Sequence, residues 1–289
     1  ERCFVLTDLE INRYNDQGYI GVEKVLSSEE VESLRDVVDQ LVEQSREITV
    51  NNDVFDLEPD HTSESPKVRR IKSPITVHPI FDQTIRHSGI LDVVAQLIGP
   101  NIRTNGNKLN MKLGEVGSAV EWHQDWSFYP HTNDDILAVG VCLDDMTEDN
   151  GCLLVVPESQ KGPILDHHLD GRFAGAVTDE SFDDGGAKKV ELPAGGMSIH
   201  HVRALHGSLP NTSSNPRRLL LFQYCAGDAW PLMGVDWEGF TSSFLRGQPS
   251  NQPRVTEVPV RIPLPGSKRT GSIYETQTIL ERSTFSSTV

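Results

Sequence analysis

The sequence has few cysteines, no long hydrophobic run and no excess of basic residues. Its cysteines form no Cys-x-x-Cys pair, so neither a disulfide scaffold nor a zinc ribbon is expected. No apolar stretch approaches the roughly 20 residues of a membrane-spanning helix. The formal net charge of −16 argues against a general nucleic-acid-binding protein, because such proteins need an excess of Lys and Arg. The four cysteines are Cys3, Cys142, Cys152 and Cys225.

The same absences indicate a compartment and a class of partner. Unpaired cysteines are typical of a reducing environment, and no charged segment followed by an apolar one opens the sequence as a secretory leader would. We therefore expect a cytoplasmic protein with a small-molecule partner, and neither nucleic acid nor membrane as a partner. Its 37% of hydrophobic residues is ordinary for a folded protein.

Helical patterns are concentrated in the first hundred residues. The clearest has a capping box, Ser27 with Glu30 three positions later, followed by apolar residues at helical spacing. Ser88 is expected to cap another helix. Residues 51–67 are acidic and contain two prolines, which is typical of a surface loop. The expected helices are residues 8–16, 28–45 and 88–98.

Beyond residue 100 the pattern changes to short strands separated by Gly, Pro, Asn and Asp. Several short strands with such turns favour an antiparallel sandwich or barrel over an α/β fold. The segment 157–186 is rich in Gly and Asp and has little pattern. The expected strands are residues 102–113, 119–126, 136–144, 152–156, 187–192, 197–202 and 217–226.

No linker or repeat marks a second domain, so one domain is expected over residues 1–289. We divide it into a helical N-terminal part (1–100), a β core (101–226) and a C-terminal extension (227–289). The extension contains many prolines and several aromatic residues. We expect it to wrap the core or to form an oligomer contact, so a homodimer is possible.

The most informative motif is His123-Gln124-Asp125, considered together with His206 far downstream. Residues two apart on a strand point to the same face, so His123 and Asp125 could hold one metal ion. Two histidines and a carboxylate on one side of a metal leave the other side open, as in non-haem Fe(II) oxygenases. An isolated His-x-Asp is most often a surface pair, so further residues must support this interpretation.

Arg217 supplies that support. It follows His206 by eleven positions and begins a strongly apolar strand. A cosubstrate that chelates a metal and carries a distal carboxylate needs a fixed guanidinium, because Arg can donate two parallel hydrogen bonds to a carboxylate. Ser208 could donate a further bond.

Four stretches together carry a family resemblance: His123-Gln124-Asp125, the run from Asn150 to Gly162, His206-Gly207-Ser208 and Arg217. Over about residues 9–226 they resemble the phytanoyl-CoA dioxygenase family of Fe(II)- and 2-oxoglutarate-dependent oxygenases. The resemblance implies a mainly β fold, a double-stranded β-helix (a jelly-roll or cupin-like barrel) with N-terminal helices packed on it. The family often has Pro-Gly-Ser-His-Lys-Gly where this chain has Pro-Glu-Ser-Gln-Lys-Gly, a turn that holds no metal ligand.

The resemblance also implies a role for each motif residue. His123, Asp125 and His206 bind iron in this scheme, and Arg217 with Ser208 binds the far carboxylate of 2-oxoglutarate. In the family a polar residue on the strand before the His-x-Asp motif also holds the cosubstrate. Lys108, Asn110 and Lys112 share one face of that strand, and of these Lys108 and Asn110 are the candidates.

The expected reaction uses Fe(II), 2-oxoglutarate and O2 to hydroxylate an aliphatic carbon of a small metabolite, with release of succinate and CO2. Related halogenating enzymes have a small residue where this chain has Asp125, so halogenation is not expected. One alternative is a zinc hydrolase built on the same three ligands. Another is a binding module that keeps only the shape of the family.

Other polar and aromatic residues receive a structural interpretation. His200 and His201 adjoin the metal strand, and packing is the favoured role for both. A basic cluster could be a solvated loop or could face substrate. Aromatic residues around the first motif are expected to pack in the barrel, with Trp126 or Phe128 as a pocket wall. The cluster is Lys67, Arg69, Arg70 and Lys72, and the aromatics are Trp122, Trp126, Phe128 and Tyr129.

Overall fold

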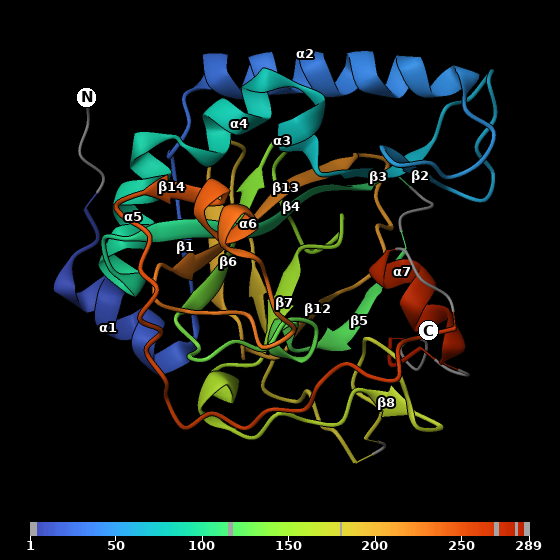
Figure 1. The fold of residues 1–289 in the computed structure, drawn as a ribbon. Coiled ribbons are helices and arrows are strands. Elements are labelled where there is room, and N and C mark those ends of the chain that lie inside the picture. The colour runs from blue at the N-terminus through green and yellow to red at the C-terminus, as the bar shows by residue number, and fades with distance from the viewer. Residues whose placement is uncertain (1–4, 115–117, 180, 269–271, 281–282, 286–289) are drawn as a thin grey trace.

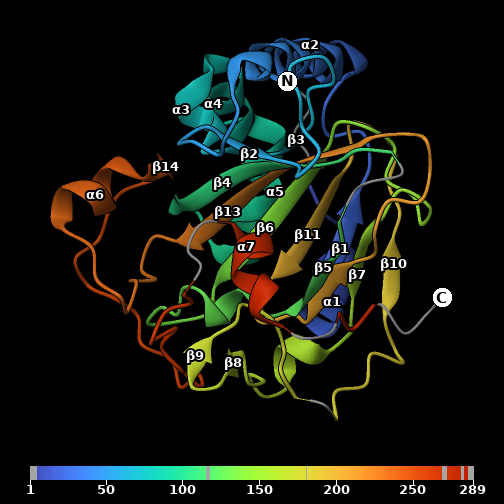
Figure 2. The same ribbon diagram turned by 90° about the vertical axis from the view of Figure 1, so that its right-hand side faces the viewer.

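The protein is described by a computed structural model covering residues 5–114, 118–179, 181–268, 272–280 and 283–285. Two antiparallel sheets form its centre, a double-stranded β-helix (Figures 1 and 2). The main sheet has the order β1-β11-β6-β13-β4-β3-β2, and β14 pairs with β4. Its strands are β1 (Tyr19–Val22), β2 (Phe55–Leu57), β3 (Val68–Lys72), β4 (Ile102–Lys112), β6 (Ile136–Cys142), β11 (Met197–His201), β13 (Arg217–Ala226) and β14 (Phe244–Arg246).

The smaller sheet carries the metal motifs and has the order β10-β7-β12-β5. A separate hairpin, β8-β9, lies in the irregular segment after β7. The strands are β5 (Val120–His123), β7 (Leu153–Val155), β8 (His168–Leu169), β9 (Arg172–Phe173), β10 (Lys188–Val190) and β12 (His206–Ser208).

Helices cover one side of the main sheet, where α2, α3 and α4 lie together (Figures 1 and 2). The helices are α1 (Asp8–Gln17), α2 (Ser28–Gln44), α3 (Pro74–Val77), α4 (Pro79–Ile85), α5 (Ser88–Ile98), α6 (Trp237–Ser242) and α7 (Ile273–Thr276), with 3-10 turns at Ser45–Glu47, Asp125–Ser127, Ser159–Lys161 and Gln277–Ile279.

The local signals for the first two helices are confirmed. Ser27 and Glu30 form the expected capping box at the start of α2, and Gly18 ends α1 with a φ of 79°, a conformation that favours glycine. The expected cap at Ser88 is wrong. The cap position of α5 is His87, whose side chain makes no capping hydrogen bond.

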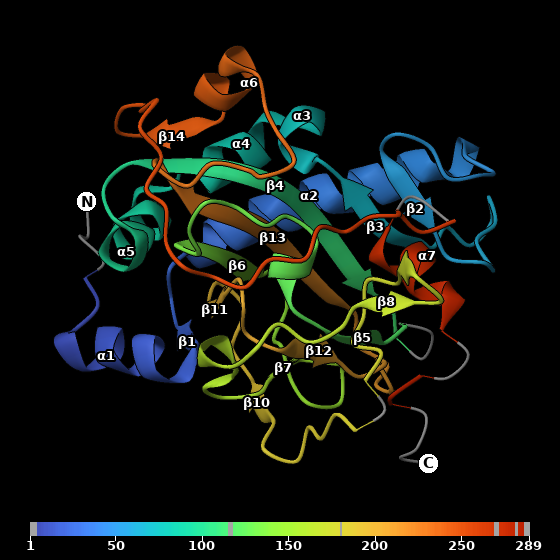
Figure 3. The ribbon, with the colours of Figure 1, turned by 60° about the horizontal axis from the view of Figure 1, so that its bottom comes forward.

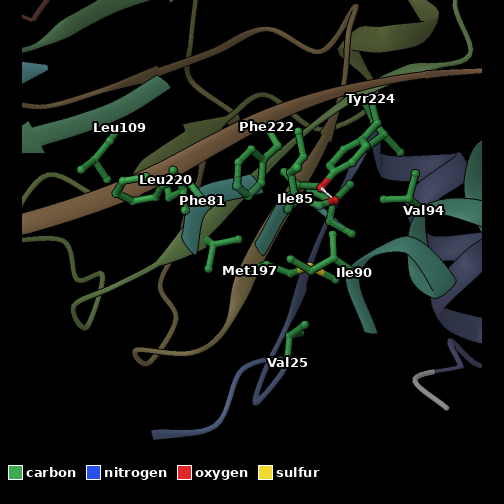
Figure 4. Packing of buried hydrophobic residues seen from close by; sticks show 14 of the residues in the cluster. Val25, Phe81, Ile85, Ile90, Val94, Leu109, Met197, Leu220, Phe222 and Tyr224 are labelled. Atoms are coloured by element: carbon green, nitrogen blue, oxygen red, sulfur yellow. Dashed lines mark hydrogen bonds between the residues drawn. The ribbon is translucent and has the colours of Figure 1, made fainter. Parts of the chain in front are cut away.

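Alternation along β13 separates the core from the site. On β13, Leu220, Phe222 and Tyr224 face the helices (Figure 4). There they pack against residues of α4 and α5, and the Tyr224 hydroxyl donates to the carbonyl of Ile85 at 3.0 Å. Residues of the opposite parity, including Arg217, face the interior of the barrel, where they line a cavity.

The first hundred residues contribute strands as well as helices: β1 lies within the segment 19–25, where weak alternation predicts a strand, and β2 and β3 were not predicted. The acidic segment 51–67 contains β2, and most of the basic cluster lies on β3, which pairs with β4. Buried Asp56 of β2 forms ion pairs with Arg70 and Lys72 of β3, both at 2.8 Å. The two segments are polar and resemble loops in the sequence. They form a hairpin on the main sheet because opposite charges face each other across the β2–β3 strand pair.

The C-terminal extension wraps the core, as expected, and Figure 3 shows it crossing from β14 to α7. Trp126 donates through its indole nitrogen to the carbonyl of Pro259 at 2.7 Å, and the backbone nitrogen of Phe173 donates to the carbonyl of Pro265 at 2.9 Å. Cys3 lies outside the described residues; the three other cysteines are buried and free. Within the described part of the chain, no helix combines the length and apolarity needed to span a membrane.

Candidate metal centre and cosubstrate site

The two motif histidines lie directly opposite each other in the smaller sheet. His123 ends β5 and pairs in register with His206 at the start of β12, and their ring centroids are 4.0 Å apart. Asp125 is not on the strand, contrary to expectation, but begins the 3-10 turn that follows it. This turn brings the carboxylate back to the histidines, and one ligand atom from each residue lies within 4.8 Å of the others. That spacing suits a single metal ion.

The backbone fixes the orientation of both imidazoles. His123 Nδ1 lies 2.8 Å from the carbonyl of Glu121, and His206 Nδ1 lies 3.0 Å from the carbonyl of Ala204. A carbonyl can only accept, so each Nδ1 carries the proton and each Nε2 keeps its lone pair. Metal-binding histidines are held by other protein groups in this way.

Burial gives the three residues the charge states that a metal needs. Desolvation lowers the pKa of His123 to about 4 and that of His206 well below its usual value, so both rings are neutral at pH 7. Burial alone would raise the pKa of Asp125, but nearby His200, His206 and Lys108 hold it well below the usual value. The site therefore presents two neutral imidazoles and one carboxylate.

His200, for which packing was the favoured interpretation, lies at this centre. It projects from β11 of the main sheet, and its ring centroid is 4.1 Å from that of His206. Its Nε2 is 3.7 Å from Asp125 Oδ2, and neither of its buried ring nitrogens has a hydrogen-bond partner. His200 therefore lies against the triad, next to His206 and Asp125.

A buried cationic site lies at one end of the same cavity. Arg217 is 4% exposed; its Nη2 donates to the carbonyl of Gly151 at 3.1 Å, and its Nε has no partner. Lys112, opposite Arg217 across the β4–β13 pair, is fully buried. Among the described residues neither cation has a carboxylate within ion-pair distance, and buried charges without partners are costly.

Ser208 completes this cationic site. Lys112 Nζ donates to Ser208 Oγ at 2.8 Å, which leaves the hydroxyl proton of Ser208 available for an incoming anion. Desolvation, reinforced by Arg217, lowers the pKa of Lys112 well below its usual value. Arg217 and Ser208 line the cavity, and Lys112 supports them through Ser208 and the carbonyl of Leu209. An incoming carboxylate would favour the charged form of both bases.

The sequence analysis placed Lys112 on the correct face of its strand but did not choose it. The two residues it preferred, Lys108 and Asn110, also line the cavity. Asn110 is 6% exposed, and its Oδ1 has no partner. Lys108 lies farther along the strand and also lines a second cavity that adjoins Asp125.

The aromatic residues of the first motif divide between packing and the site. Trp122 packs against Phe182 and Phe285, and Trp126 is fully buried under the C-terminal extension. Phe128 and Tyr129 line the second cavity. Of the two expected pocket walls, Phe128 is therefore confirmed and Trp126 is not.

Comparison with known proteins decides the family. The sequence profile of phytanoyl-CoA dioxygenase (PhyH) matches residues 14–219. The chain belongs to the phytanoyl-CoA dioxygenase family. Members of this family are Fe(II)- and 2-oxoglutarate-dependent dioxygenases, and this chain is one of them.

Individual relatives agree with this assignment. A "probable alpha-ketoglutarate-dependent hypophosphite dioxygenase" of Stutzerimonas stutzeri is 36% identical over 274 residues, 92% of this chain and 96% of the relative. L-proline trans-4-hydroxylase of Streptomyces griseoviridis is 26% identical over 237 residues, 73% and 84% of the two chains. Neither relative supports a zinc hydrolase or a non-catalytic module.

The solved structures confirm the fold class. The crystal structure of EctD from S. alaskensis with bound Fe has a TM-score of 0.65 and 22% identity, covering 77% of each chain. The double-stranded β-helix with packed helices is therefore the fold of this family member.

Proposed function

We propose that His123, Asp125 and His206 bind Fe(II), and that Arg217, Lys112 and Ser208 bind the distal carboxylate of 2-oxoglutarate. The observation that carries this proposal is the pairing of two sites in one cavity. Three convergent ligand atoms lie within 4.8 Å, and beside them a buried guanidinium has a free N–H and no anionic partner. A diacid can chelate the metal at one end and bind the guanidinium of Arg217 with the carboxylate at its other end.

Each residue then has a physical task. The bound iron and 2-oxoglutarate supply the oxidation, in which O2 gives one oxygen atom to succinate and the other to the substrate, with release of CO2. The triad holds the metal and leaves its remaining positions open. The cations at Arg217 and Lys112 orient the cosubstrate, and we propose that His200 positions the carboxylate of Asp125.

We propose that the substrate is a small molecule hydroxylated at an aliphatic carbon. The second cavity, beside Asp125, has a volume of about 210 Å³, below the ~300–1,000 Å³ of pockets for drug-sized ligands. That volume suits a small molecule better than a CoA thioester. The substrates named for the two relatives, hypophosphite and L-proline, are both small.

Substrate-dependent turnover tests this proposal. Protein loaded with Fe(II) and 2-oxoglutarate should release succinate faster when a suitable small aliphatic compound from a panel is added. Zinc-loaded protein is the matched control and should release none, because zinc has no redox chemistry. Hydrolysis by the zinc form, with no succinate from the iron form, would contradict the proposal.

We also propose that the chain forms a homodimer through its C-terminal extension, in a reducing compartment such as the cytoplasm. Leu232, Met233 and Trp237 are 43%, 49% and 52% exposed, and such apolar patches often mark interfaces. Light scattering should give a molar mass twice that of the chain for the wild type. The Trp237→Glu variant should have the mass of a single chain. A monomeric wild type would contradict the dimer.

A further inference from the structure

The cavity beside Asp125 has one polar and one apolar wall. Arg70 of β3, Lys108 of β4 and Tyr129 form most of the polar wall. Phe128 and Phe173 face them, and their rings contact edge-to-face at a centroid distance of 4.9 Å. A ligand with one charged end and one apolar end would suit such a pocket.

Lys108 is the most unusual residue of the polar wall. Within the described parts of the chain its ammonium has no hydrogen bond and no ion pair, although burial lowers its pKa. The carboxylate whose charge acts on it is Asp125, which is committed to the metal in the proposed function. Lys108 is half-buried, and a partly desolvated lysine with no partner of its own is costly. An anionic ligand would compensate for that cost.

Arg70 adds a second cation with unused hydrogen-bonding capacity. Its Nε lies 2.8 Å from Asp56 Oδ2. The two groups are too poorly aligned to form a hydrogen bond with each other. Asp56 is shared with Lys72, so one carboxylate serves two bases. The cavity wall therefore keeps an excess of positive charge.

Tyr129 supplies a directed donor. Gln223 Nε2 donates to Tyr129 Oη at 2.6 Å, so the hydroxyl proton of Tyr129 is not used in that bond. That proton also lies within hydrogen-bond reach of Asp125, which the proposed function commits to the metal. The phenol, which is protonated at neutral pH, can then donate a hydrogen bond to an anion in the cavity.

We propose that the substrate is a small oxyanion, a phosphonate or a carboxylate, whose charged end is bound by Lys108, Arg70 and Tyr129. This inference rests on the proposed function and names its substrate class. The anionic end lies against the polar wall, and a C–H bond close to it faces the metal. The reaction converts R–H, 2-oxoglutarate and O2 into R–OH, succinate and CO2; the C–H bond and the 2-oxoglutarate each supply two electrons to O2.

The position of Lys108 separates this role from binding of the cosubstrate's distal carboxylate. Lys108 and Lys112 are four residues apart on one strand, which places their Cα atoms about 13 Å apart. Lys112 belongs to the cationic site of Arg217, whereas Lys108 lies where the two cavities meet and also lines the cavity of Arg70 and Tyr129. A five-carbon diacid bound to Arg217 and the iron therefore leaves Lys108 free for a second anion.

Lys108→Met is the sharpest test, because it removes the charge but keeps most of the volume. The protein is loaded anaerobically with Fe(II) and 2-oxoglutarate, and methylphosphonate, acetate and the uncharged dimethyl methylphosphonate are titrated while the visible charge-transfer band is followed. We expect at least one anion to perturb the wild-type band and the neutral ester not to. Lys108→Met should bind that anion about 10- to 100-fold more weakly, and Arg70→Met should also bind it more weakly.

Two further readouts separate binding from structure. The 2-oxoglutarate affinity of Lys108→Met should be unchanged and its thermal midpoint no lower, because the variant loses an unpaired, partly desolvated charge. Lys188→Met removes an exposed lysine and should match the wild type. Equal anion binding in Lys108→Met, or no binding of either anion to the wild type, would overturn this inference. Absence of the band itself would instead contradict the proposed function.

Discussion

Replacing Asp125 with alanine should abolish turnover by removing the metal. Asp125 supplies the only anionic ligand of the triad, and the two imidazoles that remain are neutral. Changes to groups that merely support metal ligands cost about 10- to 100-fold in affinity, so loss of a ligand should weaken Fe(II) binding by about 100-fold or more. Equilibrium dialysis with metal analysis measures the affinity, and succinate release measures the turnover.

The control for this variant is Asp53→Ala, which removes an exposed carboxylate remote from the triad in sequence. We expect that variant to bind Fe(II) like the wild type. The Asp125→Ala protein should still fold, because the carboxylate lies among His200, His206 and Lys108 rather than in the apolar core. Wild-type Fe(II) affinity in a folded Asp125→Ala protein would show that the metal binds elsewhere.

Replacing Arg217 with methionine should weaken 2-oxoglutarate binding far more than Fe(II) binding. Truncating one partner of a buried charge pair costs about 2–5 kcal/mol, so the dissociation constant of 2-oxoglutarate should rise about 30-fold or more. Stability of the protein without cosubstrate should not fall, because burial already lowers the pKa of Arg217 and its charge lacks an anionic partner among the described residues. Isothermal titration measures the affinity, and thermal unfolding measures the stability.

The adjacent residue provides a matched control. Arg218 points to the opposite face of β13 and forms an ion pair with Asp144 at 2.8 Å. Arg218→Met should therefore reduce stability and leave 2-oxoglutarate affinity unchanged. If the two variants had the same effect on cosubstrate binding, Arg217 would have no special role there.

The sequence predicted the parts of the site that local spacing determines. His123 and Asp125 are neighbours in the chain, and His206 and Arg217 lie on two strands that the short connection 209–216 joins. The family resemblance supplied their roles. The strand β12 itself was not predicted, because three residues are too few to show alternation.

The rest of the site depends on pairing between distant segments. Arg70 lies in the cavity because β3 pairs with β4, and His200 reaches the triad because the two sheets face each other. Neither fact has a local signature. The basic cluster was ambiguous for the same reason, since its acidic partner Asp56 lies on a different strand.

Some structural signals were present in the sequence but were not used. Pro79 at the start of α4, with His78 accepting a hydrogen bond from the backbone of Ile80, is a typical helix beginning. Alternation along β3 also places Arg70 and Lys72 on one face. Both features could have been predicted from the sequence.

An anaerobic titration with Fe(II) and then 2-oxoglutarate tests the central claim most directly. The wild type should develop the weak visible charge-transfer band of the iron–2-oxoglutarate chelate. Asp125→Ala should develop none, and Arg217→Met should need a much higher 2-oxoglutarate concentration. A wild-type protein that shows no band and binds zinc tightly instead would contradict the account.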